Sequence, residues 1–88
     1  MIVVNYAPKF LRRLKKLEPT LIKEVKRKIY LFQTGARHAP LKVHKLHGEL
    51  SECFAFSINY EYRIVFEYVS GSEVNLLAID DHDVYKKK

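Results

Sequence analysis

The chain has 88 residues, of which 48% are apolar and 30% charged, and this composition is typical of a folded domain rather than a disordered segment. Its length accommodates one domain (residues 1–88), its single cysteine excludes an internal disulfide, and its formal net charge is +6. No apolar run approaches the roughly 18 residues of a membrane span and the start lacks a signal-peptide pattern, so we expect a cytoplasmic protein without a membrane partner.

The first half of the chain has the pattern of one strand followed by two helices. The β-branched and aromatic run at residues 2–6 predicts a strand. Pro8 suits the first turn of a helix, and apolar residues then recur at helical spacing up to Leu17. A second amphipathic helix is predicted from Pro19 to a stop at Gly35.

After residue 40 the apolar residues alternate with other residues, which is typical of strands. Strands are predicted at residues 53–58, 62–69 and 73–79, with a hairpin turn at residues 70–72. The sequence therefore predicts an α+β fold of order β-α-α-β-β-β. We expect a two-layer sandwich, with two helices on one face of a small, mostly antiparallel sheet and polar residues on the other face.

The positive charge is concentrated in the helical half. Residues 1–50 contain 12 Lys/Arg and 3 Asp/Glu, whereas residues 51–88 contain 4 and 7. This asymmetry indicates a polyanionic partner, either nucleic acid or an acidic protein, although charges on short helices can also simply face solvent. The candidate RNA contacts on the first helix are Arg12, Arg13, Lys15 and Lys16.

Three polar groups interrupt the apolar pattern, at residues 42–47, 61–63 and 80–85. Cleavage of RNA by its own 2′-hydroxyl requires a general base, a general acid and cations that stabilise the charge developing on the phosphate. We expect the cations to be Lys42, Lys45 and Arg63. Arg63 is the strongest candidate, because a guanidinium can hold two phosphate oxygens at once.

Histidines and a carboxylate are the candidates for proton transfer. His82 stands within the C-terminal run of aspartates, whose charges favour a protonated imidazole, so His82 is the candidate acid. The candidate base is either His44 or Glu61. Tyr85 offers a flat ring on which an unstacked base can rest.

The same residues allow other interpretations. The histidines and aspartates at residues 44–47 and 80–83 are of the types that bind metal ions, but their spacing matches no established zinc motif. The acidic run also suits the start of a short C-terminal helical turn over residues 82–86. Arg63 could pair with a neighbouring glutamate instead of a phosphate.

Several motifs together resemble a known family. They are the element order, the turn KLHG (residues 45–48), the strand YRIVFEY (62–68) and the ending AIDDHDVYK (78–86). In this combination they resemble the RelE/ParE superfamily of bacterial and archaeal toxins, and most closely its YafQ-like and RelE/StbE-like mRNA interferases. The resemblance covers nearly the whole chain.

The resemblance implies a toxin of a type II toxin–antitoxin system. Such toxins cut mRNA in the ribosomal A site without a metal or other cofactor, leaving a 2′,3′-cyclic phosphate or a 3′-phosphate. The implied partners are therefore the ribosome, mRNA and a cognate antitoxin that wraps the toxin and silences it.

Site residues carry over one by one. His82 matches the histidine near the C-terminus of YafQ-like members, and His44 matches the histidine before their leucine–glycine turn. Tyr85 matches the terminal aromatic that contacts the substrate base, and Glu61 matches an active-site aspartate. Arg63 matches the strand arginine of RelE proper, which stabilises the phosphate.

Four positions depart from the family pattern. Ala55 and Ser57 stand where RelE proper has lysines, and Ser57 also stands where YafQ has a further histidine. Asp80 replaces a usual glycine and Asp81 a neutral or basic residue, which adds negative charge that opposes RNA binding. These changes favour one alternative, a decayed toxin that only binds its antitoxin. The other alternative is a ParE-like gyrase inhibitor, for which two histidines suited to proton transfer would be unnecessary.

Overall fold

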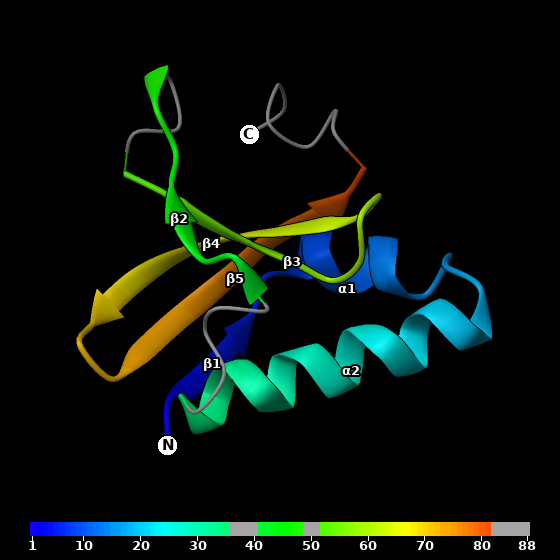
Figure 1. Cartoon of the computed structure of the whole chain (residues 1–88), viewed down its shortest axis with the longest axis horizontal. Helices are drawn as coiled ribbons and strands as arrows, with labels where there is room; N and C mark the ends of the chain where they lie inside the picture. The colour runs from blue at the N-terminus through cyan, green and yellow to red at the C-terminus, as the bar shows by residue number, and fades with distance from the viewer. Residues whose placement is uncertain (36–40, 49–51, 82–88) are drawn as a thin grey trace.

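The computed structural model of the protein describes residues 1–35, 41–48 and 52–81, which form two helices and a five-stranded sheet (Figure 1). The elements in chain order are β1 (Val3–Tyr6), α1 (Pro8–Leu14), α2 (Pro19–Thr34), β2 (His44–Lys45), β3 (Phe54–Ser57), β4 (Arg63–Ser70) and β5 (Glu73–Asp80). The strand order is β1-β5-β4-β3-β2, and only the β1–β5 pair among these described strands is parallel. The predicted α+β fold is confirmed.

Both helices begin at a proline, as predicted. Pro8 and Pro19 lie in the first turn, where the missing N–H is not needed. After α2, Gly35 adopts a left-handed conformation (φ 69°) and donates its N–H to the carbonyl of Phe32 at 3.1 Å. α1 ends at Leu14, before the last residue of the apolar pattern, and Leu17 is buried in the turn that follows the helix. Within the described residues, no helix is long and apolar enough to cross a membrane.

An aromatic cluster joins the helices to the sheet. The ring of Phe32 in α2 stacks on that of Phe56 in β3, with centroids 4.7 Å apart, and meets Phe66 of β4 edge-on at 4.9 Å. All three side chains are fully buried, so they combine apolar burial with favourable ring geometry. Phe56 and Phe66 therefore lie on the face of the sheet that packs against α2.

The opposite face of the sheet differs from the prediction of a polar surface. A second apolar cluster lies there, made of Leu46, Cys53, Ala55, Val65 and Ala78, all of them buried. The alternating pattern hid this cluster, because the small residues Cys53 and Ala55 alternate with the large rings of Phe54 and Phe56 and do not stand out as core residues. The central strands are therefore buried on both faces, and the burial of Cys53 is explained by packing.

The sheet also contains a strand that the sequence pattern did not predict. β2 has only two residues, and it pairs antiparallel with β3 through His44 opposite Ala55 and Lys45 opposite Phe54. Two residues cannot display an alternating period, so β2 is recognisable only from its partner. The predicted helical turn at residues 82–86 lies outside the described residues.

Candidate functional site

The register of the sheet aligns three polar residues across its central strands. Arg63, the first residue of β4, lies opposite Ser57 of β3 on one side and opposite Asp80 of β5 on the other. Residues directly opposite each other in antiparallel strands project from the same face of the sheet. Ser57, Arg63 and Asp80 therefore form one row at the end of the sheet where β4 begins.

His44 of β2 projects from this same face, one row further along the sheet. It lies opposite Ala55, which lies opposite Val65, and Val65 is two residues beyond Arg63. Two strand spacings and two residue rises place the Cα atoms of His44 and Arg63 roughly 12 Å apart. The fold thus brings a candidate base and a candidate cation to one face, at a separation that a bound RNA segment would bridge.

A hollow of about 240 Å³ lies beside Arg63, and three cations border it. They come from three parts of the chain: Lys28 from α2, Lys42 from the segment that precedes β2, and Arg63 from β4. The other described lining residues are uncharged, namely Ser57, Ile58, Asn59 and Tyr60. Because no carboxylate is among the described lining residues, the hollow suits an anion such as a phosphate.

The turn between β3 and β4 holds the guanidinium of Arg63 in place. Asn59 Oδ1 accepts the backbone N–H groups of Glu61 and Tyr62, both at 2.8 Å, and so closes the turn. Arg63 Nη1 donates to the carbonyl oxygens of Asn59 at 3.0 Å and Tyr62 at 3.3 Å. These bonds use one terminal nitrogen of a group with five N–H donors, so the other nitrogens can meet phosphate oxygens.

The ring of His44 is oriented by the backbone of Lys42. Its Nδ1 lies 2.8 Å from the Lys42 carbonyl oxygen, and the histidine is exposed. Since a carbonyl oxygen only accepts, Nδ1 carries the hydrogen in this contact, and Nε2 is the basic nitrogen of the neutral ring. Lys42 has a φ of 55°, in the left-handed region that non-glycine residues seldom adopt. Lys42 therefore orients His44 through its carbonyl and borders the hollow through its side chain.

The structure places Glu61 in different surroundings from Arg63. Glu61 lines a neighbouring hollow of about 350 Å³ together with Glu18, Thr20, Leu21, Glu24 and Asn59. Glu24 is paired with Arg27, but Glu18 and Glu61 add two further carboxylates, so this hollow disfavours a phosphate. Of the two candidate bases, only His44 shares the sheet face of Arg63.

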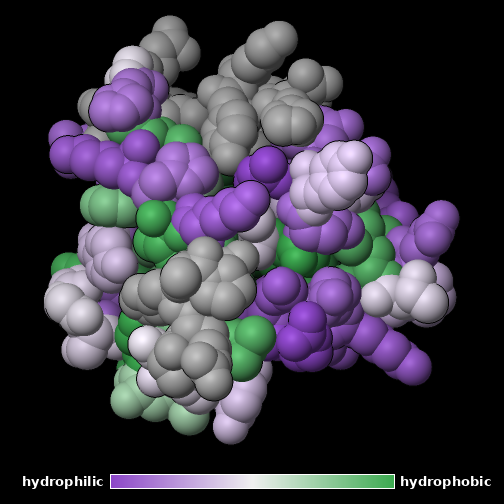
Figure 2. All heavy atoms as spheres, viewed as in Figure 1, coloured by the Kyte–Doolittle hydropathy of each residue, from purple (hydrophilic) through white to green (hydrophobic). Residues whose placement is uncertain are grey.

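The remaining candidate cations lie on different surfaces. Lys45 is opposite Phe54, so it projects from the sheet face that carries the aromatic core rather than from the face of His44. On α1 and the turn after it, Arg12, Lys15 and Lys16 are exposed. Figure 2 shows hydrophilic side chains gathered over α2 as well.

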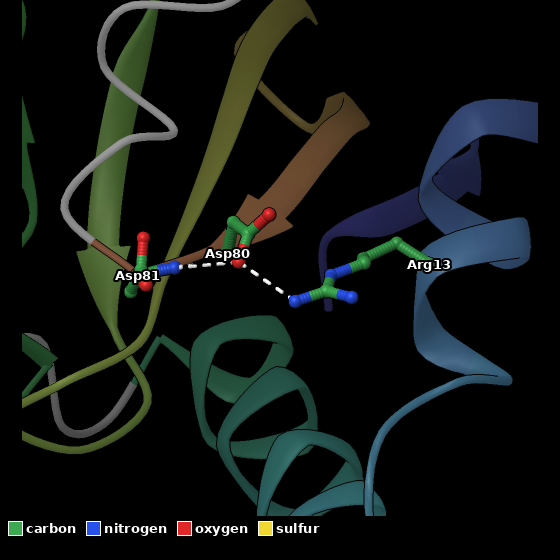
Figure 3. Close-up of polar contacts among 3 residues, drawn as sticks. All are labelled: Arg13, Asp80 and Asp81. Atoms are coloured by element: carbon green, nitrogen blue, oxygen red, sulfur yellow. Dashed lines mark hydrogen bonds and ion pairs between the residues drawn. The ribbon is translucent and has the colours of Figure 1, made fainter.

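Arg13 is bound within the molecule. Its Nη2 donates to Asp80 Oδ1 at 2.9 Å, which joins α1 to the end of β5 (Figure 3). The same oxygen accepts the backbone N–H of Asp81 at 3.0 Å (Figure 3). Asp80, one of the four departures from the family pattern, therefore has a partner on α1 that offsets its charge.

The candidate acid His82 and the candidate stacking residue Tyr85 lie outside the described residues. The metal-site interpretation also includes His82 and Asp83, which lie outside the described residues. Among residues 1–35, 41–48 and 52–81, no three His, Cys, Asp or Glu side chains are grouped closely enough to share a metal ion.

Two residues of the hollow, Lys28 and Tyr60, were not predicted from the sequence. Lys28 is one of four cations between residues 23 and 28. It follows the buried Val25 by three residues, so helical spacing places it next to the buried face of α2, and this spacing could have distinguished it from the other cations. Tyr60 lies in a turn, where no periodic pattern exists to single it out.

Comparison with solved structures gives matches that cover almost the full length of both chains. YafQ from E. coli strain BL21(DE3) matches with a TM-score of 0.77 and 10% identity, over 96% of this chain and 97% of that one. A chain of the toxin–antitoxin complex RelBE2 from Mycobacterium tuberculosis matches with a TM-score of 0.72 and 22% identity, over 92% and 98%. A chain of the heterotetrameric YoeB–YefM toxin–antitoxin complex from Staphylococcus aureus matches with a TM-score of 0.71 and 19% identity, over 93% and 98%.

No protein-family model and no curated protein matches the sequence of this chain. Identities of 10 to 22% keep the likeness to solved structures at the level of the fold. At that level the agreement is extensive, and it bears out the resemblance seen in the sequence motifs. The fold of this chain is that of the RelE/ParE toxins.

Proposed function

We propose that this protein is the toxin of a type II toxin–antitoxin system and acts as a metal-independent, ribosome-dependent mRNA endoribonuclease. The observation that carries the proposal is the hollow bordered by Lys28, Lys42 and Arg63, because Arg63 shares a sheet face with His44. An arginine and a histidine on one sheet face supply two of the functions that RNA cleavage requires, namely phosphate stabilisation and proton transfer. The fold shared with toxin–antitoxin proteins supports the same conclusion.

In the proposed reaction, the 2′-oxygen attacks the adjacent phosphorus and the bond from phosphorus to the 5′-oxygen breaks, which yields a 2′,3′-cyclic phosphate. His44 Nε2 accepts the proton of the 2′-hydroxyl, and His82 donates a proton to the departing 5′-oxygen. Arg63 and Lys42 stabilise the additional negative charge on the phosphate, and Tyr85 stacks on a substrate base. Each proton transfer contributes a rate factor of roughly 10²–10⁴.

Geometry favours His44 over Glu61 as the base. The contact between Nδ1 and the Lys42 carbonyl directs the basic nitrogen of His44 away from its own backbone segment. Glu61, by contrast, borders a hollow that also contains Glu18 and Glu24, where a phosphate is repelled. Glu61 is therefore the second choice for this role.

The proposed partners, the ribosome and an antitoxin, are inferred from the positive charge of the helices. The exposed cations of α1 suit the phosphates of ribosomal RNA, and the same surface suits an acidic, amphipathic antitoxin. Two of the solved structures with this fold are toxin–antitoxin complexes, RelBE2 and YoeB–YefM. We propose a cognate antitoxin as the regulatory partner on that basis.

The test is primer extension on mRNA within minutes of inducing the protein without an antitoxin. We expect new 5′ ends only within translated frames. His44→Ala should remove them, whereas His47→Ala, an exposed histidine three residues away, should leave them unchanged. Arg63→Ala should slow cutting by roughly 10²–10³-fold, the usual effect of losing a group that stabilises transition-state charge. The matched control is Arg27→Ala, which removes an exposed arginine from α2.

Two outcomes would contradict the nuclease. Intact messages in arrested cells would indicate a gyrase inhibitor, as proposed for the ParE-like alternative. Intact messages in growing cells would indicate a decayed toxin, in agreement with Ala55 and Ser57 at positions where RelE proper has lysines.

A further inference from the structure

Charges of opposite sign are separated on the two sides of the β3–β4 turn. Lys28, Lys42 and Arg63 border the hollow on one side of the turn. Glu61 borders the hollow on the other side, with two further glutamates. Asn59 lines both hollows, so the turn itself is the boundary between them. An anionic ligand approaching this end of the sheet is therefore attracted to the hollow of the three cations and repelled from its neighbour.

Tyr60 is presented at the rim of the cationic hollow. Tyr60 is one of the residues that line the hollow, and it is 86% exposed, more than Tyr30 at 58% or Tyr68 at 41%. The turn that carries Tyr60 is closed by the two hydrogen bonds to Asn59 Oδ1. An aromatic ring on a fixed turn offers a flat surface at little cost in conformational entropy, and packing within the described residues does not account for its position.

A phosphate site next to an exposed aromatic ring matches one ligand class in particular. Single-stranded nucleic acid presents a phosphate and an unstacked base within one nucleotide, whereas the bases of a duplex are already stacked and paired. Stacking on an aromatic ring is available to every base, so such a site positions a strand without selecting its sequence.

We propose that Lys28 and Tyr60 extend the site to a second nucleotide: Tyr60 stacks on the base of the nucleotide next to the scissile bond, and Lys28 binds its phosphate. The proposal rests on the nuclease function for the identity of the RNA, and it assigns Lys28 and Tyr60 as positioning residues. Arg63 then lies between the proposed base and the proposed stacking ring, because His44 lies across the sheet from it and Tyr60 lies on the turn before it. The bound strand runs from the His44 row, past Arg63, to the ring of Tyr60.

The test measures binding separately from cleavage. The probe is a single-stranded hexanucleotide with 2′-O-methyl groups, which lacks the attacking hydroxyl and stays intact, and binding is followed by fluorescence anisotropy at low salt. Tyr60→Ala should weaken binding by roughly 5- to 150-fold, the range for loss of one stacked base, while Tyr60→Phe should bind like the wild type. Lys28→Ala should make the negative slope of log K against log salt concentration shallower by about 0.7, the value for one phosphate contact on a single strand.

Matched controls are available on α2. Tyr30→Ala removes another exposed tyrosine, and Lys26→Ala removes another lysine from the same helix; both should bind the probe like the wild type. Thermal denaturation of each variant checks folding, and the high exposure of Tyr60 predicts an unchanged melting temperature for Tyr60→Ala.

The two proposals fail in different ways. Weakened probe binding by Tyr60→Ala in a protein that cuts no message supports the subsite and refutes the nuclease. Cutting in translated frames with probe binding unchanged by Tyr60→Ala and Lys28→Ala refutes the subsite and leaves the nuclease intact. Absence of probe binding by the wild type also refutes the subsite.

Discussion

Arg13 and Asp80 show how a single contact changes the interpretation of two residues. The sequence predicted that Arg13 contacts RNA and that Asp80 opposes RNA binding by its charge. In the structure the two side chains form an ion pair at 2.9 Å, with 38% and 25% of their surfaces exposed. Arg13 Nε is buried and has no hydrogen-bond partner among the described residues, so the guanidinium is held through Nη2. The pair neutralises the end of β5 and withdraws one cation from the surface of α1.

We expect this ion pair to contribute modestly to stability. A double-mutant cycle of Arg13→Ala and Asp80→Ala, followed by urea denaturation, should give a coupling energy of about 0.5–1 kcal/mol at low salt. Since the pair is partly exposed, the coupling should decrease at about 1 M salt, where the Debye length is roughly 3 Å. The control cycle is Arg27→Ala with Glu24→Ala, a more exposed pair within one helix, which should couple less strongly. A coupling energy of zero for Arg13 and Asp80 would mean that the contact does not persist in solution.

At the scale of secondary-structure elements, asparagine side chains add hydrogen bonds at two places in the sheet. Asn59 closes the β3–β4 turn. At the other side of the sheet, Asn5 of β1 donates to Glu73 at 2.8 Å and to Asn75 at 3.0 Å, and Asn75 donates to Glu67 at 3.0 Å. This ladder ties the parallel strand β1 to the β4–β5 hairpin, whereas the Asn59 turn positions Arg63.

These two asparagines make a matched pair for mutagenesis. Asn59→Ala leaves two backbone N–H groups without their acceptor, so we expect a loss of about 1–2 kcal/mol in the free energy of unfolding. It should also reduce mRNA cutting, because the turn no longer fixes the guanidinium of Arg63. Asn5→Ala should cost a similar amount in urea denaturation while leaving cutting unchanged. Equal cutting by both variants would show that the turn does not position Arg63.

Elements with a signal in the local sequence were predictable, whereas features that depend on strand pairing alone were not. Pro8, Pro19 and Gly35 act through local backbone geometry, so the helix limits that they set follow from the sequence. β2 is recognisable only because His44 and Lys45 pair with Ala55 and Phe54 of β3. Likewise, a row of residues such as Ser57, Arg63 and Asp80 depends on the register of three strands, which a sequence pattern does not contain.

At the scale of the whole molecule, the positive surface is unevenly available to an anionic partner. On α2, Arg27 is hydrogen-bonded to Glu24 at 2.7 Å, and this hydrogen bond holds the pKa of Glu24 below its usual value. Both groups therefore stay charged near neutrality and largely cancel each other. The sequence of α1, residues 8–14, contains no acidic residue, and its exposed Arg12 lies directly beside the paired Arg13. The two arginines differ in exposure and in pairing, because Arg12 is exposed whereas Arg13 is partly buried and bound to Asp80.

This difference gives a prediction for binding to the ribosome. Arg12→Gln should remove one phosphate contact and make the negative slope of log K against log salt concentration shallower by about 0.9, the value per phosphate on duplex DNA. Arg13→Gln should leave the slope unchanged, because the guanidinium that it removes is bound to Asp80. Each affinity would be measured by cosedimentation with ribosomes over a range of salt concentrations, with the nuclease inactivated by His44→Ala. If both variants make the slope equally shallower, the Arg13–Asp80 pair opens when RNA binds, and Asp80 then competes with phosphate for Arg13.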